Sequence, residues 1–420
     1  MKAEVIAIGS ELLLGGLPET NSLFLVDELA KLGIEAGWKT VVGDDEVDLE
    51  EALRRALERS PLVITTGGLG ATVDDLTKKV VAKVTRRTLI LKKDLLQDLH
   101  EKYLRRRHLP GGQAGKMPKD YEKQALLPSR AHVLKNPTGM APGFVMEFKG
   151  SYLVVLPGVP HEMRRIFRDS VRGLLQKQWR GHRPFILQVI RTFGLTEAKV
   201  NDMLKDLFES SSSQRLGLVA GPTGVDIHAV AQAGPGARGV DGIERLKEIL
   251  RKRLGEVIYS EEGKDMEEVV GLALKVRGFK ISVAESCTGG LIGHRLTNIP
   301  GSSTYFERGV ICYSDQCKLD LLRVPQGVIA KYGAVSPQTA CALGEGVRKL
   351  AKTDLGLGIT GIAGPGGGTL AKPVGLVFIA LAHSGETRCE GHQYSGDRWS
   401  LKLCFSQAAL DLVRRHLLHL

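Results

Sequence analysis

The feature of this sequence that most constrains its fold is a repeated pattern of short buried strand, glycine-rich loop and helix. Residues 2–8, 61–66 and 280–284 are short, largely apolar runs, typical of strands buried in a parallel sheet. Each run leads into a loop rich in glycine or serine, and apolar residues at helical spacing follow. This alternation predicts an α/β fold with mostly parallel sheets, whose ligands bind at the carboxyl ends of the strands.

The chain is long enough for more than one core. It has 420 residues, of which 43% are hydrophobic, and this supports two or three domains. We predict domains at residues 1–170, 171–260 and 261–420. The middle segment combines short strands with two amphipathic helices, which indicates a small α+β module. No catalytic pattern is visible in it, so we expect a spacer or a dimerisation element.

The apolar runs and the cysteines bear on the location of the protein. No apolar run has transmembrane length, and the first residues begin a strand rather than a signal peptide. All six cysteines fall in the last third of the chain without C-x-x-C pairs, which argues against a zinc site and for reduced thiols. We therefore expect a soluble, cytoplasmic protein with no membrane partner.

The net charge of +11 raises the question of nucleic-acid binding. Basic residues are frequent between positions 78 and 135, where acidic residues are interspersed among them. This segment is either a wall that faces phosphate or a solvated, arginine-rich surface, and we favour the second interpretation. Nucleic acid is therefore not the partner that we expect. The basic residues include Arg86, Arg87, Lys92, Lys93 and Arg105–Arg107.

The loop after the strand 61–66 has the composition of a phosphate site. Gly67, Gly68 and Gly70 allow backbone N–H groups to approach a phosphate closely. Asp74 and Asp75 follow at once, and adjacent carboxylates beside a phosphate suit a hard divalent cation. Alternatively, the two acids stabilise the start of a helix. The local sequence leaves both interpretations open.

The stretch Ala284–Gly290 predicts a second site. It lies at a strand-to-helix turn, where Ser286 and Thr288 are expected near free backbone N–H groups that can meet an anion or a polarised carbonyl. Simple helix capping is the alternative. A serine nucleophile without a histidine needs another base, and Ser–Lys pairs supply one. Lys318, which follows a buried strand and lies near Tyr313, is the candidate base; otherwise it is an ordinary surface lysine.

The N-terminal motifs resemble, in order and spacing, the molybdopterin-binding-like domain of the CinA family. They are Gly9–Leu13, Thr66–Gly70, Asp74–Asp75 and Leu156–Pro160, and Ala71 stands where that family usually has proline. The resemblance implies a metal-dependent pyrophosphatase acting on ADP-ribose-like dinucleotides with Mg²⁺, Mn²⁺ or Co²⁺. It implies that Glu11, Asp74 and Asp75 serve the metal or the attacking water. The residues implied to line the nucleotide pocket are Gly67, Gly68, Gly70, Asn136 and Gly158.

The middle segment resembles the KH-like linker domain of the same family, without the Gly-x-x-Gly clamp of nucleotide-binding KH modules. The last segment resembles the nicotinamide-nucleotide amidase domain that closes CinA proteins. The motifs that carry this second resemblance are Ala284–Gly290, Gly301–Ser303, Tyr313–Lys318, Gly361–Pro365 and Ser395–Arg398.

The second resemblance implies hydrolysis of nicotinamide mononucleotide (NMN) to nicotinate mononucleotide and ammonia, with no cofactor in this domain. It implies Ser286 as nucleophile, Lys318 as base and Tyr313 as proton relay, with Ser303 as a rival nucleophile. Cys287 is a possible thiol nucleophile, but the family pattern points to the adjacent hydroxyl. Arg398 would bind the 5′-phosphate. The other residues implied to hold the substrate or the oxyanion are Thr288, Gly289, Gly290, Thr360, Gly361 and Gly364.

These expectations describe a bifunctional hydrolase of pyridine-nucleotide salvage, with NMN and ADP-ribose as small-molecule partners and a homodimer as the expected assembly. Two alternatives belong to other classes. One is a nucleic-acid-binding accessory protein of DNA uptake, and the other is a molybdopterin-binding module.

Overall fold

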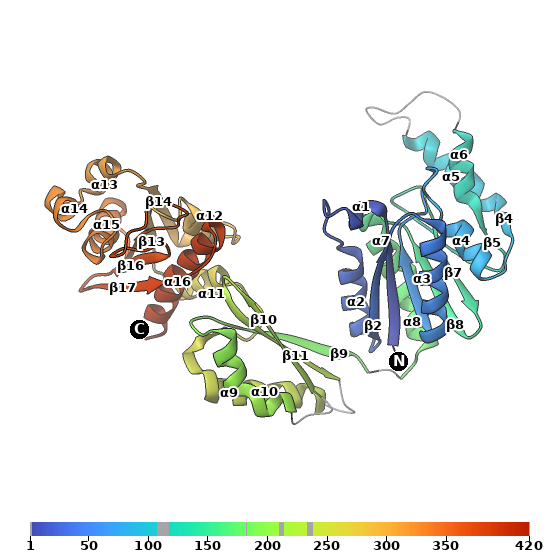
Figure 1. Ribbon diagram of the computed structural model, residues 1–420, viewed down its shortest axis with the longest axis horizontal. Coiled ribbons are helices and arrows are strands. Elements are labelled where there is room, and N and C mark those ends of the chain that lie inside the picture. Colours follow the sequence, from blue (N-terminus) through green and yellow to red (C-terminus); the bar gives the residue numbers. More distant parts are fainter. Residues whose placement is uncertain (1, 107–116, 182, 210–213, 233–237, 420) are drawn as a thin grey trace. The chain divides into compact units, whose positions relative to one another are not determined.

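The computed structural model describes residues 2–106, 117–181, 183–209, 214–232 and 238–419. These residues form two compact units (Figure 1). The main part of the first unit ends at Ile186, and the second contains Leu187–Ala231 and Arg238–Leu420. Arg107 of the basic segment lies outside the described residues.

The first unit is built on a six-stranded sheet in the order β2-β1-β3-β8-β7-β6. The first four of these strands are parallel, and β7 and β6 are antiparallel. The sheet strands are β1 (Lys2–Ile8), β2 (Glu35–Val42), β3 (Leu62–Thr66), β6 (His132–Leu134), β7 (Gly143–Phe148) and β8 (Ser151–Leu156). A separate antiparallel pair consists of β4 (Leu89–Leu91) and β5 (Leu126–Pro128).

Helices cover both faces of this sheet (Figure 1). Along β1, Val5 packs with α2, α7 and α8, whereas Ile6 packs with α3, α4 and α5. Because both faces of β1 are covered, its residues from Ala3 to Ile8 are all buried, as the apolar run predicts. The helices are α1 (Ser10–Leu13), α2 (Asn21–Lys31), α3 (Glu46–Arg59), α4 (Thr77–Val84), α5 (Lys93–Arg106), α6 (Lys119–Glu122), η1 (Lys123–Ala125), α7 (Pro160–Ile166), η2 (Phe167–Val171) and α8 (Arg172–Gln178).

The second unit begins with a four-stranded sheet in the order β10-β11-β9-β12. Its antiparallel pairs and its helices form the small α+β module that the sequence predicts. The elements are β9 (Phe185–Thr192), α9 (Glu197–Glu209), β10 (Gln214–Gly221), β11 (Gly224–Gln232), α10 (Arg238–Leu254), η3 (Gly255–Val257) and β12 (Ile258–Ser260).

The rest of the second unit is a five-stranded sheet in the order β14-β13-β15-β16-β17, with helices on both faces. β13 is parallel to β14 and β15, and β16 and β17 are antiparallel. Its strands are β13 (Ile281–Glu285), β14 (Phe306–Ile311), β15 (Leu355–Gly361), β16 (Leu376–Ala382) and β17 (Thr387–Gln393). Its helices are α11 (Met266–Arg277), α12 (Leu291–Thr297), η4 (Ser302–Thr304), α13 (Asp315–Leu322), α14 (Gln326–Tyr332), α15 (Pro337–Ala351) and α16 (Arg398–Leu418).

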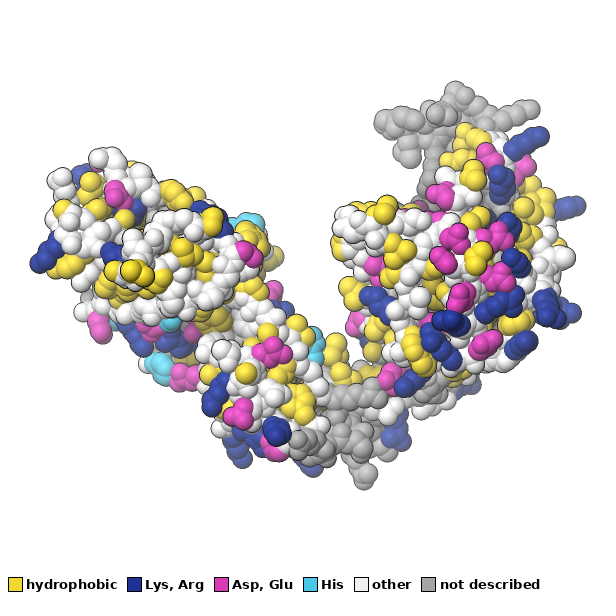
Figure 2. Space-filling view, viewed as in Figure 1, with side chains coloured by type: hydrophobic (Ala, Val, Ile, Leu, Met, Phe, Trp, Pro, Cys, Tyr) yellow, Lys and Arg dark blue, Asp and Glu magenta, His cyan; other side chains and the backbone are white. Residues whose placement is uncertain are grey.

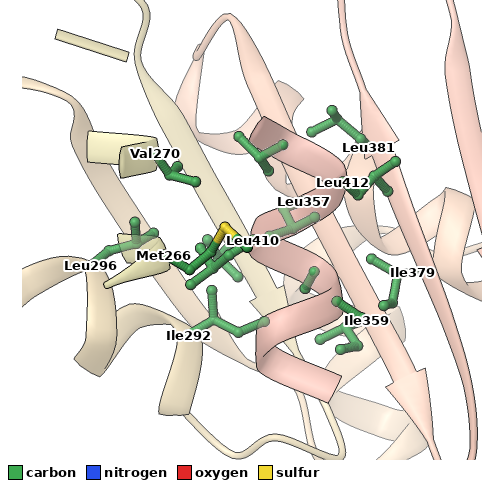
Figure 3. Packing of buried hydrophobic residues seen from close by; sticks show 14 of the residues in the cluster. Met266, Val270, Ile292, Leu296, Leu357, Ile359, Ile379, Leu381, Leu410 and Leu412 are labelled. Atoms are coloured by element: carbon green, nitrogen blue, oxygen red, sulfur yellow. The ribbon is translucent and has the colours of Figure 1, made fainter. Parts of the chain in front are cut away.

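One face of this second sheet carries the larger core. Figure 3 shows Met266 of α11 and Ile292 of α12 beside α16, facing strand residues such as Leu357 and Ile379. The smaller core on the other face packs α13 and α15 against β13, and Cys312 is part of it. β14 ends at Ile311 and none of its residues is buried, so the strand before Lys318 is not the buried strand that the sequence predicts.

The predicted α/β class is confirmed, with antiparallel strands added to both large sheets. Within the described part of the chain, no helix has the length and apolar character needed to cross a membrane.

Candidate active sites

A cavity of about 520 Å³ lies at the carboxyl ends of β1, β3 and β8 in the first unit. The predicted residues that line it are Glu11, Gly67, Gly68, Gly70, Asp74, Asp75 and Gly158. Asn136 is buried behind this wall, and its Nδ2 donates a hydrogen bond to Glu162 Oε2 at 2.6 Å. Since Glu162 lines the cavity, Asn136 acts on the site through Glu162.

The glycine loop of this cavity has a shape that only glycine permits. Gly67 and Gly68 have φ angles of +117° and +64°. A Cβ on Gly67 would lie 2.1 Å from the carbonyl oxygen of Ile8, and one on Gly68 would lie 2.2 Å from Thr77 Oγ1. The loop therefore packs its backbone against its neighbours, and its chain can approach a ligand closely.

The two adjacent aspartates have different tasks. Asp75 accepts hydrogen bonds from the amides of Gly70 (2.6 Å) and Thr72 (2.8 Å), so it holds the loop closed. Asp74 is exposed toward the cavity, and a hydrogen bond from Thr72, together with its own backbone amide, lowers the pKa of its carboxyl. Neither side chain caps α4. No hydrogen bond therefore supports the alternative in which the two aspartates stabilise the start of a helix.

The carboxylates of this cavity suit a cation that arrives with a phosphate. In the described ranges, no group of three or more His, Cys, Asp or Glu side chains is arranged to hold a metal ion. Mg²⁺, however, is commonly bound by one or two carboxylates, with phosphate and water oxygens completing its shell. Glu11 and Asp74 fit that requirement, whereas a cage made only of protein ligands is absent from the described residues.

A buried lysine supports the segment that contributes Tyr121 and Gln124 to this cavity, and its burial could not be predicted from the sequence. Lys78 is 7% exposed, and its Nζ donates a hydrogen bond to the carbonyl of Lys123 at 2.9 Å. Burial lowers the pKa of Lys78 to about 8, partly opposed by the charge of Asp75.

A second cavity, of about 210 Å³, lies at the carboxyl ends of β13 and β15 in the second unit. The predicted residues that line it are Ser286, Tyr313, Lys318, Thr360, Gly361 and Arg398. Ser286 follows β13 directly, and its amide donates to the carbonyl of Ile359 at 3.2 Å. The parallel pairing of β13 with β15 therefore fixes the position of the serine.

Lys318 is buried at this cavity, with 1% of its surface exposed. Its Nζ donates to the carbonyls of Tyr313 (3.1 Å) and Ser314 (3.3 Å) and to Asp315 Oδ1 (3.4 Å). Ser314 caps α13 by accepting from the amide of Cys317. Lys318 is thus held inside the first turn of α13 and is not a surface lysine.

The expectation of free N–H groups at the start of α12 is wrong. The Glu285 carboxylate is buried there and accepts from the amides of Gly290 (3.0 Å), Ile292 (3.1 Å) and Gly293 (2.8 Å). A carboxylate of the chain itself thus satisfies these donors of the helix. Gly289 and Gly290, with φ of +62° and +96°, shape the turn.

Several other predicted residues lie near this cavity with their polar groups engaged. Thr360 Oγ1 donates to the carbonyl of Ala334 at 2.8 Å. The Arg398 guanidinium donates to the carbonyl of Gly364 and, at 3.1 Å, to the hydroxyl of Tyr313. Thr288 is buried outside the cavity wall, and its Oγ1 has no partner in the described part of the chain.

The two rival nucleophiles differ from Ser286 in their surroundings. Ser303 is exposed on η4 and does not line the cavity. Cys287 does line it, but burial raises the pKa of its thiol to about 12. Because the thiolate is the reactive form, a thiol with this pKa is a poor nucleophile at neutral pH.

The sequence analysis did not anticipate Lys402. It lies one helical turn after Arg398 on α16, and a Cβ placed on Gly289 would be 3.6 Å from its Nζ. Its charge also acts on the buried thiol of Cys287, where it opposes the rise in the pKa of that thiol. The spacing of four residues between Arg398 and Lys402 could have indicated that both side chains lie on the same face of a helix.

The fold and its cavities define an α/β protein with two separate candidate sites, each at the carboxyl ends of parallel strands. Family models match three successive parts of the chain. They are a probable molybdopterin binding domain at residues 4–177, the damage-inducible protein CinA KH domain at 188–260 and the CinA C-terminal domain at 263–417. The chain belongs to the CinA family.

Relatives match over the whole length. A competence-damage inducible protein of Caldicellulosiruptor bescii is 40% identical over 418 residues, covering 100% of both chains. One from Desulforudis audaxviator is 41% identical over 418 residues, covering 99% of both. Among solved structures, the protein CinA of Thermoplasma acidophilum is 35% identical over 41% of this chain and 97% of its own, with a TM-score of 0.37.

Proposed function

We propose that the C-terminal cavity deamidates NMN, giving nicotinate mononucleotide and ammonia. The observation that carries this proposal is the shared cavity of Ser286 and the buried Lys318. A serine hydroxyl needs a base to become a nucleophile, and a lysine amine supplies one in Ser–Lys pairs.

The chemistry proceeds in two halves. Ser286 Oγ attacks the carboxamide carbon while its proton passes to Nζ of Lys318, which serves as the base. The tetrahedral intermediate collapses, the C–N bond breaks, and ammonia leaves with the proton that Lys318 returns. Water then attacks the acyl ester, giving its proton to Lys318, and that proton returns to Ser286 Oγ as the carboxylate product forms.

Other residues of the cavity support this chemistry by position. Cys287 and Ala363 line the cavity, and their amides donate to no backbone carbonyl among the described residues, so these amides are candidates to receive the oxyanion. Arg398, fixed to Gly364 and Tyr313, closes one side of the cavity.

Ammonia release from NMN by the full chain tests the proposal. We expect turnover by the wild-type protein, turnover by the Ser303→Ala variant and loss of at least about 1,000-fold in the Ser286→Ala variant, as for removal of a nucleophile. Wild-type protein that releases no ammonia, or Ser286→Ala protein close to wild type, would refute it.

We also propose that the N-terminal cavity cleaves a dinucleotide diphosphate such as ADP-ribose. The support is the glycine loop beside exposed carboxylates at the strand ends. A bound divalent cation would neutralise phosphate charge and lower the pKa of a water nucleophile. Glu11 and Asp74 are the residues that would hold it, while Asp75 keeps the loop in shape.

Release of AMP from ADP-ribose, with and without added Mg²⁺, Mn²⁺ or Co²⁺, tests this second activity. Cleavage that needs the metal and is lost in the Asp74→Asn variant supports it. Retention of a pterin on purification without any cleavage would favour the alternative that the name of the matched domain suggests.

A further inference from the structure

One wall of the N-terminal cavity is separate from the glycine loop and the carboxylates and differs from them in chemistry. Tyr121, Gln124, Met140 and Ala141 line it together. An aromatic ring, an amide and two apolar side chains suit a flat heterocycle better than they suit a diphosphate.

Gln124 is the unusual member of this wall. It is only 3% exposed, yet its Oε1 has no hydrogen-bond partner in the described ranges of the chain. Native proteins pair nearly all buried polar groups, because an unpaired one costs about 1–3 kcal/mol. The described part of the fold therefore does not use Oε1 of Gln124 for a hydrogen bond of its own.

The backbone around Gln124 is nevertheless firmly fixed. The carbonyl of Lys123 accepts from the buried Lys78 at 2.9 Å, and the carbonyl of Ala125 accepts from the amide of Lys92 at 3.0 Å. Ala125 itself is fully buried in the core. Hydrogen bonds to the residues on either side of Gln124 thus fix its backbone position at the cavity.

Tyr121 precedes Gln124 by three residues and contributes the aromatic surface. Its ring lies 5.9 Å from that of Tyr103 of α5, at 57°, and remains partly exposed. A partly exposed ring in a cavity wall offers a face on which a base can stack, a contact worth about 1–3 kcal/mol.

We propose that Gln124 and Tyr121 form the base-recognition part of this cavity, selecting a nucleobase that presents an amino group beside a ring-nitrogen acceptor, as adenine does. A side-chain amide pairs with such an edge through two hydrogen bonds, since it carries a donor and an acceptor. Rotation of the terminal amide of Gln124 brings either group to the cavity. The inference rests on the proposed diphosphatase and names the residues that would discriminate among its nucleotide substrates.

The test combines a protein variant with a ligand variant in full-length protein. Gln124→Met keeps the length of the side chain and removes the amide, and the exposed Gln97→Met is the matched control. The ligands are ADP-ribose, its purine analogue without the 6-amino group, and inorganic pyrophosphate, each measured by calorimetry with Mg²⁺ present.

We expect the wild-type protein and Gln97→Met to bind ADP-ribose about 10-fold or more tightly than the deaminated analogue. Gln124→Met should weaken ADP-ribose binding by a similar factor, lose the discrimination and bind pyrophosphate as before. Its thermal midpoint should be unchanged or higher, because Oε1 of Gln124 has no partner among the described residues, whereas a structural role would lower it. Tyr121→Phe should keep the affinity, and Tyr121→Ala should reduce it.

The outcomes separate the two proposals. ADP-ribose that binds with this selectivity but is not cleaved would refute the diphosphatase and leave base recognition standing. Equal binding of both ligands by the wild-type protein, discrimination that survives in Gln124→Met, or no binding of either ligand would overturn the base-recognition proposal, whether or not the diphosphate is cleaved.

Discussion

Two buried lysines of this chain lie in different surroundings. Lys318 has three oxygen acceptors around its Nζ, whereas Lys78 has one backbone carbonyl. The acceptors of Lys318 hold its nitrogen at a fixed place beside the cavity of Ser286. Burial lowers the pKa of Lys78 because its single hydrogen bond does not make up for the lost hydration of the ammonium group. The positive charge of Lys78 therefore destabilises the first unit.

Replacing Lys78 with methionine should therefore stabilise the first unit at neutral pH. The pKa of Lys78 falls from 10.5 to about 8 on folding, so its charge is unfavourable to folding below pH 8 and this cost disappears as pH rises to 10.5. We expect a gain of up to about 3 kcal/mol at pH 7, reduced by the lost hydrogen bond and shrinking between pH 8 and 10.5. Urea unfolding across this pH range measures it, with the exposed Lys93→Met as control; a gain independent of pH would contradict it.

Lys402 should contribute to substrate affinity. The cavity around Ser286, at about 210 Å³, is small for a nucleotide, so part of NMN must extend past it. Arg398 is already engaged by Gly364 and Tyr313, and Lys402 is the cation next to the turn. Lys402→Met should raise KM for NMN about 10-fold with little change in kcat. The exposed Lys349→Met is the control, and an unchanged KM would exclude Lys402 from binding.

At the scale of elements, two glycines bring α15 directly onto β15. A Cβ on Gly358 would lie 2.4 Å from both the carbonyl oxygen of Ala340 and the amide nitrogen of Gly344, and one on Gly356 would lie 2.2 Å from the carbonyl oxygen of Gly344. The neighbouring Leu357 and Ile359 point into the opposite core. Period-two alternation along β15 thus separates a helix-contact face from an apolar face.

Gly358→Ala should therefore destabilise the second unit by about 3 kcal/mol or more, because backbone atoms of α15 must move away. Gly385→Ala is the control, since nothing lies within 4 Å of a Cβ at that site. Thermal unfolding of both variants measures the difference. Equal midpoints would show that the helix does not lie against the strand in this way.

The sequence predicts the strands and helices of this fold well, because their apolar periodicity is local. β1, β3 and β13 lie at the apolar runs 2–8, 61–66 and 280–284. The burial of Lys78 and of the Glu285 carboxylate, which accepts from the first amides of α12, could not be predicted. The burial of a charged residue depends on which elements cover it. From the sequence alone, the glycines of β15 indicate only a weakened strand. The structure shows that they are needed because the backbone of α15 packs directly against them.

At the scale of the whole molecule, the two cavities belong to two compact units. Asp74→Asn should abolish diphosphate cleavage and leave ammonia release unchanged, and Ser286→Ala should do the reverse. Both assays on each variant and on the wild-type protein measure this separation. Loss of both activities in either variant, with the fold intact by circular dichroism, would contradict independent sites.

The charge of the molecule gives a further prediction. Figure 2 shows Lys and Arg mixed with Asp and Glu over the visible face of the first unit. Ion pairs such as Lys79–Glu46 and Lys83–Glu50 lie at the surface of the first unit. We expect only weak binding to duplex DNA that disappears at physiological salt. Tight binding at physiological salt in a fluorescence anisotropy titration would instead support the DNA-uptake alternative.

The central claim is that Ser286, activated by Lys318, becomes acylated by the pyridine carboxamide. Mass spectrometry of full-length protein quenched with acid during NMN turnover tests it most directly. We predict the acyl group of the nucleotide on Ser286 itself, located by fragmentation of the peptide that carries Ser286 and Cys287, and its loss in the Ser286→Ala and Lys318→Met variants. An adduct on Cys287 or Ser303, or steady turnover by the Lys318→Met variant, would contradict the account.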